Sequence, residues 1–249
     1  DLHRLIRRQR QMCIRDSFVT VTYNPVRAYS DTIQGGVDAA FAGDTLTVVA
    51  GTYNENVDVA KSLTIIGAGA DQTIVQGPNP TDHVFQITAG WVNVSHVRVS
   101  GAVTATYAGV LLSGSDNSRV ENVNATGNYH GIRLAASSSA YIANNTGYSN
   151  TQAGILLEGA GNNEIINNTL LLNARGIRIQ AAASTGNNVS GNNASENNDG
   201  ISLSGVNNNT IYNNSVTSNT GYGVEIFGSE DMDVLDNTIL NNTQGVYIY

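Results

Sequence analysis

A unit of 22 to 24 residues recurs from about Gly109 to the end of the chain, and this repeat restricts the possible folds more than any other feature. Each copy opens with glycine, then isoleucine or valine, any residue, and leucine or isoleucine. Gly154–Leu157 is one example and Gly245–Ile248 is another. A fixed period of this length is typical of solenoids, in which every copy stacks on its neighbours. The fold must therefore place equivalent residues of consecutive copies next to one another.

The opening segments have the period of β-strands. Ile155 and Leu157 point to one side and Leu156 to the other, which is the alternation of a strand. No segment between copies is suited to a crossover helix, which excludes a series of βαβ units. Such short strands bury their apolar faces by stacking on the next copy, ~4.8 Å away. We predict an all-β chain wound as a parallel β-helix with coils of 22–24 residues, in the right-handed form that is usual for this coil length.

Asparagines recur at two positions of the coil, and stacking predicts that each set forms a column. Asparagine tolerates the left-handed backbone of a bend, and stacked amides can donate to and accept from one another. We expect the first set to form one inward ladder: Asn145, Asn168, Asn192, Asn214 and Asn237. We expect the second set to mark another bend: Asn128, Asn150, Asn173, Asn197, Asn219 and Asn242.

Residues 1–17 differ from the rest of the chain in composition. They contain five of the 12 basic residues and no glycine. Arg7–Ser17 matches the translation of a transposase adapter used in sequencing libraries, so we treat residues 1–17 as an artefact and exclude them from fold reasoning. The alternative is a basic N-terminal arm. The segment also holds Cys13, the single cysteine, so we expect no disulfide and no thiolate metal site in the remainder.

Residues 18–249 are acidic, with seven basic and 18 acidic residues and a formal charge of −11. This charge argues against nucleic acids and anionic membranes as partners. No apolar run approaches the roughly 20 residues of a membrane span, so we expect no membrane insertion. The sequence stops within the strand Gly245–Tyr249, and we expect a C-terminally truncated, monomeric module of a larger protein.

The residues ahead of the first coil predict a cap. Phe18–Tyr23 alternates as a strand, and Asp31-Thr32 is placed to cap a short helix over Ile33–Phe41. Solenoids need caps because an open end exposes core residues and strand edges. The apolar face of the helix consists of Ile33, Val37, Ala40 and Phe41. We predict one domain over residues 18–249, with the cap at about 18–45, irregular coils at about 46–108 and regular repeats at 109–249.

Several motifs resemble those of secreted right-handed β-helix proteins. Gly-Asp-Thr stands at Gly43–Thr45, Gly-x-Tyr-x-Glu-Asn-Val at Gly51–Val57, and Lys-Ser-Leu-Thr at Lys61–Thr64. With the later repeats, residues 28–249 resemble NosD-type and pectate-lyase-like families of carbohydrate-binding proteins and sugar hydrolases. The resemblance implies a location outside the cell or in its envelope or periplasm. Because one fold hosts many functions, it leaves the activity open.

Two columns of outward residues flank the apolar strand of each copy. The residues just before the opening glycine are Ala108, His130, Ala153, Arg175, Asp199, Tyr222 and Gln244. The residues two positions after that glycine are Leu111, Arg133, Leu156, Arg178, Ser202, Glu225 and Tyr247. On a β-helix each column becomes a row of neighbouring side chains along the solenoid.

These columns supply seven of the candidate glycan-binding residues, and Glu158 follows Leu157 on the same face. An arginine pairs bidentately with a uronate carboxylate, and a tyrosine can stack on a sugar ring. The alternative is a solvated face with charge pairs that contribute little. The candidates are His130, Arg133, Glu158, Arg175, Arg178, Asp199, Tyr222 and Glu225.

Enzyme and metal signatures are weak. The close aspartate pair, Gly-His-Gly and Arg-x-Lys of the polygalacturonase-like pattern are missing, so no catalytic residue is assigned. An acidic group at Glu230, Asp231, Asp233 and Asp236 is a candidate for Ca²⁺, with an ordinary charged bend as the alternative. His83, His96 and His130 lie in different coils and do not form a copper-like cluster.

The sequence therefore predicts a β-helix module with a structural or glycan-binding role and no clear catalytic activity. Its partners would be polysaccharides or other components of the cell envelope. One alternative is a lyase, hydrolase or epimerase that acts on acidic polysaccharide along the outer face of the β-helix. A second alternative is a NosD-like protein of copper maturation.

Overall fold

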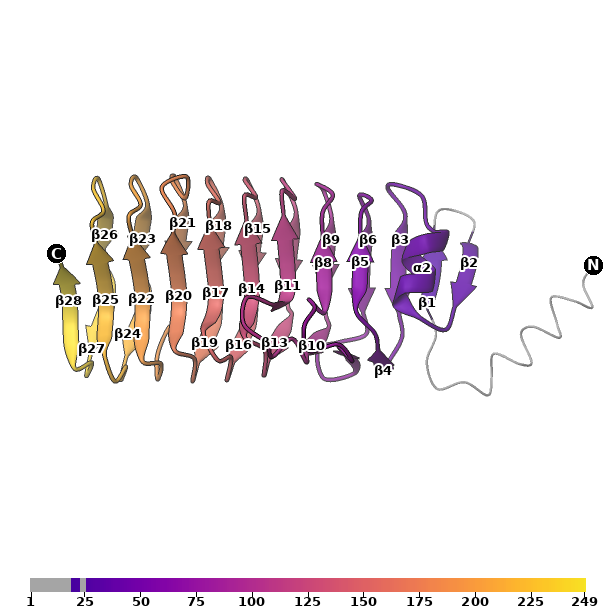
Figure 1. Ribbon diagram of the computed structural model, residues 1–249, viewed down its shortest axis with the longest axis horizontal. Helices are drawn as coiled ribbons and strands as arrows, with labels where there is room; N and C mark the ends of the chain where they lie inside the picture. The colour runs from indigo at the N-terminus through magenta and orange to yellow at the C-terminus, as the bar shows by residue number, and fades with distance from the viewer. Residues whose placement is uncertain (1–18, 23–25) are drawn as a thin grey trace, which may run out of the picture.

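The computed structural model describes residues 19–22 and 26–249. Figure 1 shows coils stacked along one axis, with a short helix at the N-terminal end. The predicted artefact at residues 1–17 lies outside the described residues, as do Phe18 and Tyr23 of the predicted first strand.

Three sheets run along the solenoid, and we name them A, B and C. Sheet A comprises β1 (Val19–Thr22), β2 (Val26–Ser30), β3 (Thr45–Val48), β6 (Thr64–Gly67), β9 (Asn93–Ser95), β12 (Arg119–Glu121), β15 (Tyr141–Ala143), β18 (Glu164–Ile166), β21 (Asn188–Ser190), β23 (Thr210–Tyr212) and β26 (Asp233–Leu235). Sheet B comprises β4 (Gly51–Asn54), β7 (Thr73–Gln76), β10 (Arg98–Ser100), β13 (Asn124–Thr126), β16 (Thr146–Tyr148) and β19 (Thr169–Leu171), and single bridges through Asn193 continue it to β24 (Ser215–Thr217) and β27 (Thr238–Leu240). Sheet C comprises β5 (Val57–Val59), β8 (Phe85–Ile87), β11 (Ala108–Ser113), β14 (His130–Ala135), β17 (Ala153–Glu158), β20 (Arg175–Gln180), β22 (Asp199–Ser204), β25 (Tyr222–Phe227) and β28 (Gln244–Ile248).

Equivalent positions of successive coils pair in parallel, which confirms the predicted parallel β-helix. Ile132 pairs with Ile155, and Ile155 pairs with Ile177. Ile155 and Leu157 are fully buried inside the coil, where they join one core cluster that runs the length of the solenoid. Leu156 points to the outer face, as the alternation predicts.

The opening glycine is required by space in the copies from Gly109 to Gly223, on each of which another coil is stacked, whereas a Cβ on Gly245 would meet nothing within 4 Å. A Cβ on Gly131 would lie 2.5 Å from the carbonyl oxygen of Gly154, and a Cβ on Gly154 would lie 2.9 Å from that of Gly176. Because real Cβ atoms do not approach backbone this closely, a side chain here would push neighbouring coils apart. The repeat therefore begins with glycine wherever two coils are in closest contact.

The first asparagine set forms the predicted inward ladder. The backbone N and Nδ2 of Asn145 both donate to Oδ1 of Asn168, each at 3.0 Å. Asn168 donates to Oδ1 of Asn192 in the same two ways, at 2.8 and 2.9 Å. The pattern continues through Asn214 to Asn237. These amides are satisfied by one another inside the coil, as the prediction requires.

The second asparagine set lies at another bend and also forms a ladder. Its members bond from Asn128 through to Asn242 in consecutive coils. A third ladder runs through Asn163, Asn187 and Asn209. The sequence reading missed this third ladder because the asparagine occurs at that position in three copies only.

The ladder asparagines do not have the left-handed backbone that we expected of them. The positive φ belongs to the preceding residue, with 57° at Asn144 and 55° at Asn167 before Asn145 and Asn168. The bend therefore uses two residues. The first turns the chain, and the second points its amide inward to the ladder.

A hairpin and a helix cover the first coil. β1 pairs antiparallel with both β2 and β3. The helix α2 spans Ile33–Ala39, and the Thr32 side chain accepts a hydrogen bond from the backbone N of Gly35, so the predicted capping helix is confirmed. Ile33 and Val37 are buried as expected. The placement of Phe41 on the buried face is wrong, because α2 ends before it and its side chain is 64% exposed.

Two motif residues hold the ends of α2. The Glu55 carboxylate accepts from the backbone N of Ile33 and of Gln34, at 2.8 Å each. Lys61 Nζ donates to the carbonyl oxygens of Val37 and Ala40 at 2.8 Å and to that of Asp38 at 3.1 Å. A negative group at the N-terminus and a positive group at the C-terminus both favour a helix. Glu55 and Lys61 therefore attach the cap to the first coils.

Candidate functional site

The two predicted columns lie on the outer face of sheet C. In the column two positions after the glycine, Arg133 pairs with Leu156, Leu156 with Arg178 and Arg178 with Ser202. In the column before the glycine, Arg175 pairs with Asp199. Each outward side chain therefore lies one coil, ~4.8 Å, from the next.

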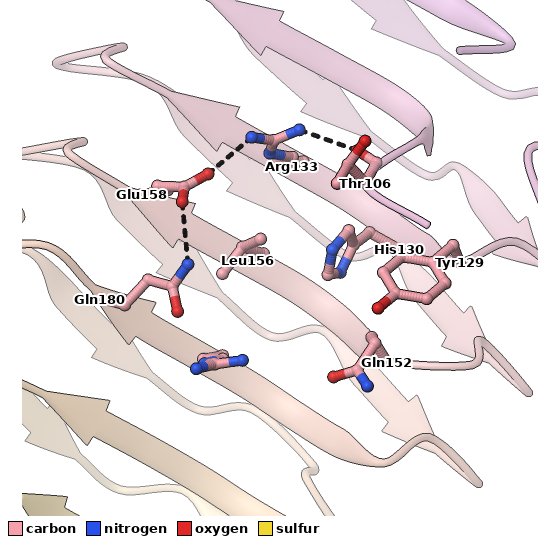
Figure 2. A pocket seen from close by; sticks show the side chains of 9 residues that line it. Thr106, Tyr129, His130, Arg133, Gln152, Leu156, Glu158 and Gln180 are labelled. Atoms are coloured by element: carbon pink, nitrogen blue, oxygen red, sulfur yellow. Dashed lines mark hydrogen bonds and ion pairs between the residues drawn. The ribbon is translucent and has the colours of Figure 1, made fainter. Parts of the chain in front are cut away.

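A pocket of about 150 Å³ opens on this face. Figure 2 shows the side chains that line it, drawn from consecutive coils and from the loop before β11. Four of the eight candidate residues line it: His130, Arg133, Glu158 and Arg178. The other lining residues are Thr106, Tyr129, Gln152, Leu156 and Gln180. We call this site the arginine pocket.

A chain of polar contacts fixes one wall of the arginine pocket. Arg133 Nη2 donates to Glu158 Oε2 at 2.6 Å, and its Nη1 donates to the Thr106 carbonyl oxygen at 2.8 Å (Figure 2). Gln180 Nε2 donates to the other oxygen of Glu158 at 3.0 Å. Burial alone would raise the pKa of Glu158, but the hydrogen bond and charge of Arg133 outweigh it and the pKa is lowered. Glu158 is therefore ionised at neutral pH and holds Arg133 in place.

His130 forms the inner part of the arginine pocket. Its side chain is 6% exposed, and its Nδ1 has no hydrogen-bond partner among the described residues. Its ring packs edge-on against Tyr129, with the centroids 4.8 Å apart. Burial, followed by the charges of Arg133 and Arg178, lowers its pKa to about 4. The imidazole is therefore neutral at physiological pH.

Arg178 is the cation in the pocket that the protein does not neutralise. Its buried Nε has no hydrogen-bond partner among the described residues. Burial and the charge of Arg175 lower its pKa, while Glu158 and Glu225 partly oppose the shift. Arg178 is half-buried and bonds no carboxylate of the protein, so its guanidinium can donate hydrogen bonds to the carboxylate of a ligand.

The remaining candidates lie outside the pocket lining. Arg175 Nε lies 3.7 Å from Asp199 Oδ2, and the Asp199 side chain is 6% exposed. Tyr222 and Glu225 lie on β25, further along the solenoid. The structure therefore brings four candidates together in the pocket. Arg175 lies outside it on β20, and Asp199, Tyr222 and Glu225 lie in the next two coils.

The acidic residues Glu230, Asp231, Asp233 and Asp236 do not converge on a calcium site. Within residues 19–22 and 26–249, no group of three or more histidine, cysteine or acidic side chains is arranged to hold a metal ion. These four residues lie in and around β26, where Asp231 and Asp236 adopt the positive φ of bends. The charged-bend interpretation fits their positions.

The sequence reading missed four polar residues of the pocket lining: Thr106, Tyr129, Gln152 and Gln180. Tyr129 stands two residues before its glycine, a position also occupied by Gln152, so a third column could have been read there. Thr106 belongs to a loop with no counterpart in the later coils, and its backbone rather than its side chain contacts Arg133. No repeat pattern indicates a contact of that kind.

A family model described as "Right handed beta helix region" matches residues 82–243, which is more than half of the chain. The chain belongs to the right-handed β-helix family. No curated protein sequence matches this β-helix chain. In its described part, no helix is long and apolar enough to cross a membrane.

Solved structures with the same fold include proteins named for polysaccharides. The A-module of a mannuronan C-5 epimerase from Azotobacter vinelandii has a TM-score of 0.68 at 18% identity, covering 87% of this chain and 76% of that chain. The catalytic unit of an α-1,3-glucanase from Streptomyces thermodiastaticus has a TM-score of 0.69 at 21% identity, covering 87% and 44%. An alginate lyase from a Paenibacillus species has a TM-score of 0.57 at 15% identity, covering 87% and 95%. At these identities the similarity extends to the β-helix fold.

Proposed function

We propose that the outer face of sheet C binds an acidic polysaccharide. Arg178 would donate hydrogen bonds to the carboxylate of one sugar. The observation that carries the proposal is the guanidinium of Arg178, which forms no hydrogen bond or ion pair with any described residue, although its Nε is buried. Arg133, by contrast, already bonds to Glu158. A planar guanidinium with free donors matches a carboxylate in geometry as well as in charge.

The local charge supports an anionic ligand. Two arginines and one glutamate line the pocket, and His130 is neutral, so the site is positive in a chain whose formal net charge is −8. An anion bound beside Arg178 would raise the lowered pKa of Arg178, because a nearby negative charge offsets the hydration that the guanidinium loses on burial. The rest of the chain is acidic and repels polyanions, so a polyanion would bind at this site rather than elsewhere on the surface.

The printed names of the similar structures also favour a polysaccharide ligand. They include a mannuronan epimerase and an alginate lyase, both on the same scaffold. Polysaccharides of this kind are found outside cells and in their envelopes, so the proposal includes a location there. The partner would be a polysaccharide of the cell surface or its surroundings.

Calorimetric titration of the full chain with uronate oligosaccharides tests the proposal. Arg178→Ala should weaken binding by about 1.5–3 kcal/mol, the cost of losing hydrogen bonds to a charged group, which is roughly 10- to 100-fold in affinity. Arg119→Ala is the matched control, because Arg119 lies on β12 of sheet A and pairs with Glu121. Equal affinities for the wild type and Arg178→Ala would refute the proposal.

A catalytic role is the second candidate, and His130 favours it. His130 lines the same pocket as Arg178, and its neutral imidazole has no hydrogen-bond partner at Nδ1 among the described residues. With a uronate carboxylate held by Arg178, a neutral imidazole can take the proton from the adjacent sugar carbon. The electron pair left on that carbon would form a carbon–carbon double bond as the bond to the glycosidic oxygen breaks, and this oxygen would take a proton from water, as in a lyase. Alternatively, the carbon would regain a proton from water on its other face, as in an epimerase.

Product analysis separates binding from catalysis. An unsaturated sugar detected by its ultraviolet absorbance, or inversion at that carbon detected by NMR, would establish the reaction. His130→Ala should then abolish turnover while oligosaccharide binding remains. If the oligosaccharides are unchanged after prolonged incubation with the wild type, the catalytic role is refuted and the binding role stands.

A further inference from the structure

An aromatic patch lies on the same outer face, further along the solenoid than the arginine pocket. It consists of Tyr222, Phe227, Tyr247 and Tyr249. Tyr222 stacks on Tyr247, with the ring centroids 5.0 Å apart and the planes at 21°. Phe227 and Tyr247 each pack against Tyr249, with centroids 4.5 and 4.8 Å apart. Phe227 and Tyr249 are 46% and 54% exposed, so the patch offers aromatic ring surface to solvent.

A carboxylate is fixed beside these rings. Glu225 Oε2 accepts from Ser202 Oγ at 2.7 Å, and its Oε1 accepts from Tyr249 Oη at 3.0 Å. The ion pairs among the described residues leave Glu225 without a bonded cation. Its charge is therefore held in position and is not neutralised by a salt bridge.

The outer face of sheet C thus changes sign along the solenoid. Arg178, Ser202 and Glu225 occupy one column in consecutive coils. Glu225 therefore lies two coils, roughly 10 Å, beyond Arg178. The surface is positive at the arginine pocket and negative at the aromatic patch.

This reversal discriminates between kinds of acidic polysaccharide. A homopolyuronate carries a carboxylate on every sugar and would place one against Glu225, where like charges repel. A neutral sugar can lay its apolar face on an aromatic ring and donate a hydroxyl hydrogen to the Glu225 carboxylate. Glu225 and the rings around it therefore select against a carboxylate at this position.

We propose that the ligand is a heteropolysaccharide lying along the solenoid axis, with an acidic sugar in the arginine pocket and a neutral sugar on the aromatic patch. This inference rests on the proposed function, because it assumes that Arg178 holds the acidic sugar. It adds the composition of the ligand and its direction across the strands of sheet C.

Calorimetry of the full chain with two hexasaccharides of equal length tests the inference. One probe alternates glucuronate with N-acetylglucosamine, and the other is an oligogalacturonate with a carboxylate on every sugar. The alternating probe should bind more tightly. Glu225→Gln should tighten oligogalacturonate binding about three- to fivefold, the range of a partly exposed charge interaction, and should not tighten binding of the alternating probe.

Tyr222→Ala adds a second readout, with Tyr148→Ala as control because Tyr148 is exposed on β16 of sheet B. Tyr222→Ala should weaken binding of the alternating hexasaccharide and leave the affinity for free glucuronate unchanged. If oligogalacturonate binds at least as tightly as the alternating probe and its affinity is unchanged by Glu225→Gln, the inference is wrong while the proposed function stands. If neither probe binds, or Arg178→Ala changes nothing, both are wrong.

Discussion

The inward asparagines within the ladder bond to one another and to the backbone, which explains why a polar residue recurs inside an apolar coil. Asn168 is 1% exposed, its Oδ1 accepts two hydrogen bonds from Asn145, and its Nδ2 donates to Ile142 and Asn192. Without these partners a buried amide would cost more than it contributes. The asparagine therefore stands at the same position in successive coils of this chain.

Asn168→Ala should lower the free energy of unfolding strongly. The substitution leaves the backbone N–H and one amide hydrogen of Asn145 without acceptors. At about 1–3 kcal/mol for each orphaned buried donor, the expected loss is roughly 2–6 kcal/mol. Urea denaturation measures it, with Asn188→Ala on the outer side of β21 as the control. A loss below about 1 kcal/mol would contradict this account of the ladder.

His130 makes stability depend on pH in a defined window. Its pKa falls from 6.5 to about 4 on folding, so between these values the unfolded chain binds a proton that the folded chain does not. The free energy of unfolding should therefore decrease as pH falls below 6.5, by up to about 1.4 kcal/mol per pH unit for one such group. The lowered pKa of His83 acts in the same direction.

Denaturation between pH 6.5 and about 5.5 reports mainly on the histidines, because a carboxyl with the usual Glu158 pKa of 4.5 takes up little proton in that range. His130→Gln should flatten the pH dependence and leave the part due to His83. An unchanged pH dependence in this variant would mean that His130 is not buried in the neutral form.

At the scale of elements, α2 is too short to be stable by itself. It spans seven residues, fewer than an isolated helix needs in water. Glu55 and Lys61 supply charged hydrogen bonds at its two ends from the strands and bends of the following coil. This explains in physical terms two residues of the motifs that resemble other β-helix proteins.

Lys61→Met should loosen the cap. The variant keeps an apolar stem but removes three hydrogen bonds to the carbonyl oxygens at the end of α2. We expect protection of the α2 amides from hydrogen exchange to fall by about 1.5–3 kcal/mol. Asp58→Asn, at an exposed position of β5, is the control. Unaltered protection in Lys61→Met would show that Lys61 does not hold the helix.

The elements that could be predicted from the sequence are those that repeat. The period places Arg133, Leu156 and Arg178 in one column, because equivalent residues of stacked coils must be neighbours. The period does not indicate how a unique loop folds over the sheet, so the contact of Thr106 with Arg133 was not predicted. It also does not show which outward side chains become buried, as His130 does.

At the scale of the whole molecule, stacking converts single outward positions into a continuous surface. Sheet C presents the arginine pocket and then the aromatic patch along one axis, and the long direction of that surface runs across the strands. A polymer that lies along the axis can contact both at once. The linked contacts would then strengthen one another without requiring a deep cavity.

A crystal structure of the full chain with the alternating hexasaccharide bound tests the central claim most directly. We predict that a glucuronate carboxylate lies within hydrogen-bond distance of the Arg178 guanidinium. The saccharide should continue across β22 towards Tyr222 on the outer face of sheet C. A saccharide bound on sheet A or sheet B, or one whose carboxylates lie away from Arg178, would contradict the account.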